Sequence, residues 1–202
     1  MNRKIKEQVC DFWRWFSSVA NDFASNFEND AILSELDARV SGFGQVTWEV
    51  GPGLEKPNAL VISPNGDSDL LGLTREIVAL SPRLPDWEFH PAKPPKQWDL
   101  RFVVEDVDGT PVKVDANDWE YVLLRFPDGT FDIVLCAPNL EGVHEDTRQL
   151  AADVAVEGVL GEIRKLQYVR RVEAVTGLEE KHRGKCTKLK HLSHHLGSLV
   201  TR

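Results

Sequence analysis

The sequence of 202 residues is poor in cysteine and has no long hydrophobic run, and both shortages exclude classes of protein. Its three cysteines are too few and too scattered for a disulfide framework, and their odd number favours a reducing compartment. No stretch approaches the roughly eighteen apolar residues of a membrane span. The polar first residues, MNRKIKEQVC, lack the apolar stretch of a signal peptide. Together these features predict a cytoplasmic protein without a membrane span.

Motifs that mark common catalytic sites are also missing. No serine lies in a Gly-x-Ser-x-Gly turn, and the glycines at 51–53 precede a strand, whereas a phosphate-binding loop precedes a helix. An EF-hand loop beginning at Asp106 would have Pro111 in place of its glycine, so a hairpin turn explains the acidic residues 105–109 better. Cys136 ends an apolar strand, where a buried and inert thiol is expected. We therefore predict no catalytic residue, metal or cofactor.

The charge is divided unevenly along the chain. Residues 181–202 contain six lysines and arginines and no acid, and subtracting their +6 from the net charge of −8 leaves −14 on residues 1–180. The phosphates of a nucleic acid would repel such an acidic body, so we expect no nucleic-acid partner for it. We predict one domain over residues 1–177, followed by a flexible, basic, histidine-containing tail at 178–202.

Hydrophobic periodicity predicts helices first and strands afterwards. Apolar residues recur every three or four positions from residue 5 to residue 27 and again from 32 to 40, which is typical of two amphipathic helices. Alternation then predicts strands at 45–50, 59–63 and 87–90, with a helix between the last two. Hairpins follow at 98–114 and 119–136, and then a helix at 145–166 that Gly158 and Gly161 weaken, and a strand at 168–175.

The fold class predicted by this order is α+β. N-terminal helices would be followed by a mixed, mostly antiparallel sheet. The halves 48–87 and 119–168 share a strand-strand-helix-strand order, which suggests an internal duplication; chance similarity in an α+β chain is the alternative.

Several segments of the sequence are similar to those of a known family. FWRWF (12–16), TWEVGPG (47–53), LVISPNGD (60–67), LPDWEFHPAKPPK (84–96) and VLGEIRKLQYVRRVEAV (159–175) resemble an uncharacterised family of bacterial cytoplasmic proteins. The resemblance spans residues 10–176 and implies a bacterial source and an α+β fold. It implies no activity and no functional residue.

The loop around residues 90–98 is the first candidate binding site. Its prolines order the backbone in advance, which lowers the entropy lost on binding. His90, Lys93, Lys96 and Trp98 then offer two cations, an imidazole and an indole to an anionic or aromatic partner. The alternative is a rigid connection whose lysines protect a sheet edge.

A second set of residues is compatible with acid-base chemistry. Glu49, Glu88 and His90 alternate with apolar residues in predicted strands, so neighbouring strands would bring two carboxylates and an imidazole together. Charged residues on the solvated face of a sheet are the simpler explanation. A hydrolase using these three residues is therefore the alternative to a binding protein.

Two further groups of residues have competing interpretations. The tail contains a set of zinc-ligand types surrounded by lysines, which oppose cation binding, and a plain basic tail is the alternative; the set is His182, Cys186, His191, His194 and His195. The first helix presents aromatic rings that suit a homodimer interface or, more simply, packing on the sheet; these rings are Phe12, Trp13, Trp15 and Phe16.

These features favour a non-enzymatic binding or interaction protein. An acidic body would steer basic proteins toward itself, which suits a regulatory or toxin-neutralising role with a protein partner.

Overall fold

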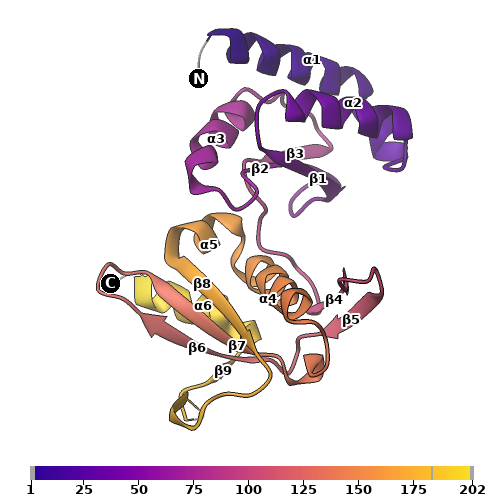
Figure 1. The fold of residues 1–202 in the computed structure, drawn as a ribbon. Helices are drawn as coiled ribbons and strands as arrows, with labels where there is room; N and C mark the ends of the chain where they lie inside the picture. Colours follow the sequence, from indigo (N-terminus) through magenta and orange to yellow (C-terminus); the bar gives the residue numbers. More distant parts are fainter. Residues whose placement is uncertain (1–2, 183, 201–202) are drawn as a thin grey trace. The chain divides into compact units, whose positions relative to one another are not determined.

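The computed structural model describes residues 3–182 and 184–200 and divides the chain into two compact units (Figure 1). Unit 1 is Met1–Lys93 and unit 2 is Pro94–Arg202. Residues 1–177, expected as one domain, span all of unit 1 and most of unit 2. The buried hydrophobic residues form two separate clusters, one in each unit, and that of unit 2 includes residues of both of its sheets.

Unit 1 begins with its helices, as the sequence predicts. Its elements are α1 (Arg3–Ser25), α2 (Asp30–Ser41), β1 (Thr47–Pro52), β2 (Asn58–Ser63), the 3₁₀ turn η1 (Ser68–Leu70), α3 (Leu71–Ala79) and β3 (Trp87–His90). Asn29 caps α2 by accepting hydrogen bonds from the backbone of Ala31 and Ile32. The sheet has the order β1-β2-β3, in which β1 and β2 are antiparallel and β2 and β3 are parallel.

The core of unit 1 is rich in aromatic rings. Phe12, Trp13 and Phe16 of α1 are almost fully buried, and Trp15 is half-buried. Phe16 packs edge to face on Trp87 of β3, with ring centroids 4.9 Å apart. Most of the aromatic arc that could have formed a dimer interface is therefore part of the core of its own unit.

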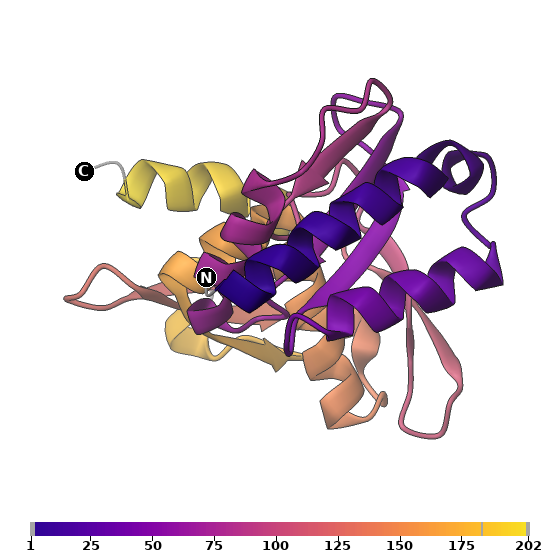
Figure 2. The same ribbon diagram turned by 90° about the horizontal axis from the view of Figure 1, so that it is seen from above.

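Unit 2 contains two sheets and a helical layer. Its elements are β4 (Arg101–Glu105), β5 (Pro111–Asp115), β6 (Glu120–Arg125), β7 (Phe131–Cys136), η2 (Pro138–Leu140), α4 (Glu145–Leu160), α5 (Glu162–Tyr168), β8 (Val169–Val175), η3 (Glu180–His182), β9 (Thr187–Lys188), η4 (Leu189–His191) and α6 (Leu192–Val200). The strands β4 and β5 pair only with each other among the described residues, and the larger sheet has the order β8-β7-β6-β9. Figure 2 shows the β4–β5 and β6–β7 hairpins extending from different sides of this unit.

The two units repeat one connectivity. In unit 1, β1 and β2 form a hairpin, and η1 and α3 lead to β3, which is parallel to β2. In unit 2, β6 and β7 form a hairpin, and η2, α4 and α5 lead to β8, which is parallel to β7. The predicted strand-strand-helix-strand repeat and the α+β class are therefore confirmed. The strands of the described chain form three small sheets, however, and not one.

The segment expected to be a flexible tail is folded over much of its length. Its strand β9 pairs with β6, and Leu189, Leu192 and Leu196 are fully buried in the core of unit 2. The reason is a stripe of leucines among the lysines and histidines, which covers one end of the larger sheet. Arg183, Thr201 and Arg202 lie outside the described residues.

None of the helices in the described part of the chain is both long and apolar enough to cross a membrane. This finding agrees with the composition.

Candidate functional site

Glu88 lies at the centre of a dense hydrogen-bond network in unit 1. Its carboxylate accepts the backbone N–H groups of Leu54, Glu55 and Lys56 at 2.7, 2.8 and 3.0 Å, and contacts His90 Nε2 at 2.8 Å. Burial raises the pKa of Glu88, but the bonds from His90 and the loop outweigh it and lower this pKa to about 2. The carboxylate therefore remains ionised and holds the β1–β2 loop.

The surroundings of Glu88 leave no room for other groups. A side chain at Gly53 would come within 2.8 Å of the Glu88 carboxyl carbon and within 2.5 Å of the Lys56 carbonyl oxygen. The Lys56 ammonium donates to the carbonyl groups of Leu84 and Trp87, at 2.8 and 2.9 Å. The loop and the start of β3 are thus connected from both sides, which is the role of a structural anchor.

Glu49 does not join this network. The sheet register pairs Glu49 with Val61, and Val61 with His90, so β2 separates the two polar residues by about 10 Å, or two strand spacings. The Glu49 carboxylate forms an ion pair with Lys93 at 3.4 Å. The structure therefore brings Glu88 and His90 together and leaves Glu49 apart. A general base must be available to a substrate, whereas Glu88 is occupied by the backbone.

The second half of the candidate loop packs against unit 2. The Lys96 N–H donates to the Gly158 carbonyl at 2.7 Å, and a side chain at Gly158 would come within 2.3 Å of the Trp98 ring. A side chain at Gly161 would come within 2.7 Å of Pro95, and the φ of +74° at Gly161 also disfavours other residues. The two glycines that interrupt the predicted helix are thus contact points for this loop.

The four predicted binding residues consequently belong to two places. His90 and Lys93 are part of unit 1, and Lys96 and Trp98 are part of unit 2. The Lys96 ammonium lies 5.6 Å from the Trp98 ring centroid, a cation–π contact within unit 2. Their role in binding a partner stays a prediction.

The histidines and cysteines of the tail are distributed over several contacts. His195 Nδ1 bonds the Tyr121 hydroxyl at 2.8 Å, and burial raises the pKa of Tyr121 to about 12. Burial likewise raises the pKa of Cys136, and a hydrogen bond to Glu120 raises that of Cys186. Across residues 3–182 and 184–200, no group of three or more His, Cys, Asp or Glu side chains has the arrangement of a metal site.

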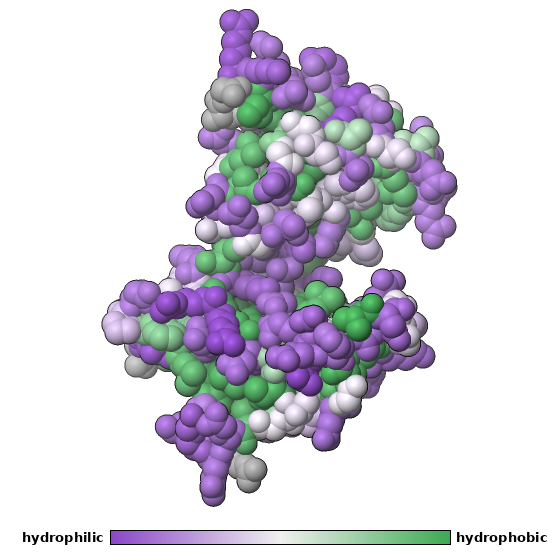
Figure 3. Space-filling view, in the orientation of Figure 1, coloured by the Kyte–Doolittle hydropathy of each residue, from purple (hydrophilic) through white to green (hydrophobic). Residues whose placement is uncertain are grey.

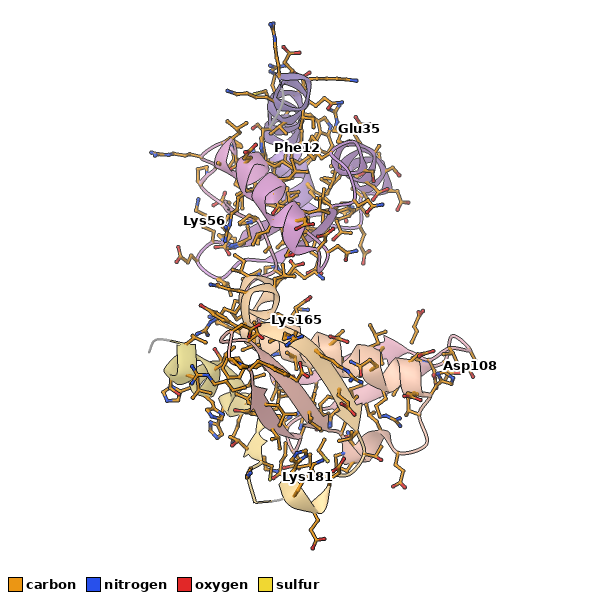
Figure 4. The ribbon with its side chains drawn as sticks, turned by 60° about the vertical axis from the view of Figure 1, so that its left-hand side comes forward. Phe12, Glu35, Lys56, Asp108, Lys165 and Lys181 are labelled. Carbon is orange, nitrogen blue, oxygen red and sulfur yellow. The ribbon has the colours of Figure 1, made fainter. Side chains whose placement is uncertain are left out.

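A strongly acidic surface lies where the β4–β5 turn meets the start of α4. The Thr147 hydroxyl of α4 donates to the Asp106 carboxylate at 2.6 Å and joins the two segments. We call this surface the acidic corner; it consists of Glu105, Asp106, Asp108, Glu145 and Asp146. Figure 4 shows Asp108 at the outer end of the hairpin.

The negative charge of Asp108 is favoured by its local structure. Asp108 accepts the Thr110 N–H at 2.9 Å, and hydrogen bonds from Thr110 lower the pKa of Asp108. Glu145 and Asp146 lie in the first turn of α4, where the helix dipole favours negative charge. Local hydrogen bonding thus favours the ionised form of Asp108.

Aliphatic side chains are exposed beside these carboxylates. Val103 of β4 is 58% exposed and Val107 of the turn is 65% exposed. Figure 3 shows hydrophobic patches surrounded by hydrophilic residues over the region of β4 and β5. An acidic surface with exposed valines can bind a protein through charge and apolar contact together.

Sequence reasoning identified the acidic turn only as a hairpin, which the structure confirms. It missed that this turn lies close to the start of α4. The two residues of the Thr147–Asp106 bond are 41 positions apart in the sequence. The sequence does show two segments rich in acidic residues, but their spacing does not predict that the two segments lie close together.

No protein-family model, curated protein or solved structure matches this chain.

Proposed function

We propose that this chain is a non-enzymatic binding protein of regulatory or neutralising type, whose partner is a basic protein of the bacterial cytoplasm. The observation that carries the proposal is the acidic corner. Three of its carboxylates, Glu105, Asp106 and Asp108, flank the exposed Val107, and the Thr147–Asp106 bond brings the first turn of α4 to this turn. The exposed Val103 precedes Glu105 by two residues on β4 and lies opposite Lys113 of β5. The net charge of −8 on the whole chain, its basic C-terminal segment included, adds a long-range attraction for a basic partner.

The physical roles of the two kinds of side chain differ. The carboxylates raise the rate of encounter with a basic surface, and this effect weakens as salt screens the charges. The valines supply apolar area that leaves water on binding, and this part persists at high salt. A partner with lysines or arginines around an aliphatic patch would satisfy both.

The experiment compares two variants, each lacking three negative charges, in affinity capture from cells that produce the protein. The first variant, D108N/E145Q/D146N, removes three charges from the acidic corner. Because the amide introduced by D108N retains an oxygen acceptor for Thr110, we expect the turn to be preserved. We expect a basic protein captured by the wild type to bind this variant about tenfold more weakly or worse, as three charge contacts are lost.

The matched control is D22N/E28Q/D30N, which removes three charges from unit 1 and produces the same net charge. It is expected to bind the purified partner with nearly wild-type affinity. Equal weakening by both variants would show that only the total charge matters, and binding that ignores the acidic corner variant would refute the proposal.

A further inference from the structure

The β4–β5 ribbon has two edges, and they differ in their capacity to accept another strand. On the β5 edge, Pro111 has no N–H, Lys113 is charged, and the Asp115 carbonyl already accepts the Asn139 amide at 3.0 Å. These are devices that prevent edge-to-edge pairing. The β5 edge is therefore protected.

The β4 edge lacks this protection. At one end of β4, the Ala116 N–H donates to the Leu100 carbonyl at 2.9 Å. At the other end, the Asp106 N–H donates to the Thr110 carbonyl at 2.8 Å, so residues 100 and 106 bond toward the β5 side. Because antiparallel ladders alternate, the N–H and C=O groups of residues 101, 103 and 105 point away from β5. The Arg101 N–H bonds the Asp99 carboxylate. Across the described residues, no hydrogen bond uses the N–H of Val103 or Glu105.

The side chains along this edge are complementary to themselves. Arg101, Val103 and Glu105 alternate on the outer face of the ribbon, and all three are exposed. If two β4 strands pair antiparallel with Val103 at the two-fold axis, Arg101 lies opposite the partner's Glu105, and the two Val103 side chains meet. Opposite charges and apolar residues in directly facing positions stabilise strand pairing.

We propose that this edge is a homodimer interface, in which β4 pairs antiparallel with β4 of a second copy about an axis at Val103. The product is a four-stranded sheet of the order β5-β4-β4-β5. The Val103 N–H donates to the carbonyl of the partner's Val103, and the Glu105 N–H donates to the carbonyl of the partner's Arg101. The two-fold axis doubles each bond.

The Arg101 side chain can bind carboxylates of its own chain and of the second copy at the same time. Its guanidinium already contacts Asp115 at 2.9 Å and Asp99 at 3.4 Å, and it has five N–H donors. The partner's Glu105 approaches from the other side. No ion pair within the described part of the chain uses Glu105, so the dimer gives it a partner.

The test measures the dissociation constant of the full chain by sedimentation velocity over a range of concentrations. The variant R101E places glutamate opposite glutamate, and E105R places arginine opposite arginine. We expect each homodimer to weaken at least about tenfold, because two attractive cross-strand pairs become repulsive. An equimolar mixture of the two variants restores both pairs and is expected to form a heterodimer of nearly wild-type affinity.

Two further variants separate this interface from a change in folding. V103P removes an N–H that faces away from β5, so it is expected to abolish the dimer and leave the circular dichroism spectrum unchanged. K113E, on the protected β5 edge, is expected to leave the dimer intact. Should R101E unfold because its bond to Asp115 is lost, E105R and V103P still decide the question.

A wild type that remains monomeric up to about millimolar concentration overturns the proposal. So does a dimer that tolerates both E105R and V103P. The dimer would bury Val103 and Glu105, which the proposed function also uses. The two proposals are nevertheless tested separately, because sedimentation of the chain alone reports the dimer and needs no basic partner.

Discussion

Units 1 and 2 contain the same strand-strand-helix-strand module, but different segments of the chain pack on it in the two units. In unit 1, two helices precede the module: α1 supplies aromatic rings, among them Phe12, Phe16 and Phe23, and α2 supplies aliphatic side chains. In unit 2, the module's own helix α4 packs through small residues, and a segment that follows the module adds Leu192 and Leu196. The aromatic core suits a wide gap, whereas alanines allow a close approach of helix and sheet.

This difference shows that the module is incomplete alone. In each unit the module's own helices leave part of the apolar sheet face uncovered, and the chain supplies the rest from the segment before or after the module. The N-terminal helices and the C-terminal segment are therefore equivalent in energetic role, although only the helices have an obvious hydrophobic periodicity.

The largest expected effect is from truncation after Gly177, which removes the cover of unit 2. Leu189, Leu192 and Leu196 are fully buried, and losing about 2 kcal/mol for each would consume much of the stability of a domain. We expect residues 1–177 to lose the unfolding transition of unit 2 in calorimetry. A control that changes only the exposed Ser198 to alanine should keep it. An unchanged transition in the truncated chain would contradict the role assigned to the tail.

The second prediction compares glycines in the two module helices. G158A in α4 would force a methyl group against the Trp98 ring and is expected to cost about 3 kcal/mol in the free energy of unfolding. G72A in α3 meets open space and is expected to stabilise unit 1 by about 0.5 kcal/mol. Denaturant titrations of both variants check the contrast, and equal effects would contradict it.

The third prediction concerns the anchor in unit 1. E88Q is expected to cost about 2 kcal/mol near pH 7, since it weakens charged hydrogen bonds to three backbone groups. The pKa of Glu88 is lowered from 4.5 to about 2, so its contribution is complete above pH 4.5 and is lost as the pH falls toward 2. The stability gap between the wild type and E88Q should therefore close over this interval.

The matched control for the anchor is E49Q in the same sheet. The Glu49 side chain is 47% exposed and forms an ion pair with Lys93, so a change below about 0.5 kcal/mol is expected. If E49Q and E88Q have similar effects at pH 7, Glu88 is not the anchor that its hydrogen bonds indicate.

The smallest effect is expected from Y121F, which removes the bond between β6 and His195 of α6. The expected cost is about 1 kcal/mol in unit 2. Y168F, at a half-buried tyrosine, serves as the control and should change the free energy of unfolding by a few tenths of a kcal/mol at most. Thermal unfolding followed by near-ultraviolet circular dichroism distinguishes the two variants.

Much of the fold could be predicted from the sequence because its elements are locally encoded. The alternation in residues 119–126 and 130–136 corresponds to β6 and β7, and the turn at Pro127-Asp128-Gly129 joins them. The weak point predicted in the helix at 145–166 corresponds to Gly161, where α4 ends and α5 follows. Hydrophobic period and turn residues were sufficient for these elements.

What could not be predicted depends on contacts between distant residues. The leucine stripe of the tail is short and lies among lysines and histidines, so its charge concealed its core role. From the sequence, Glu88 and Trp98 could have contacted a ligand. In the structure the Glu88 carboxylate accepts hydrogen bonds from the backbone of residues 54–56, and the Trp98 ring packs against Gly158. Partners of this kind become visible only when the chain is folded.

The hydrogen-bonded position of Glu88 in the β1–β2 loop has a consequence for the order of folding. The β1–β2 loop is closed by a side chain that reaches it only after α3 has crossed the sheet and β3 has paired with β2. We therefore expect its three backbone bonds to form late, on the native side of the folding barrier. If they do, a change at Glu88 accelerates unfolding and leaves the folding rate almost unaltered, which rapid-mixing measurements on E88Q check.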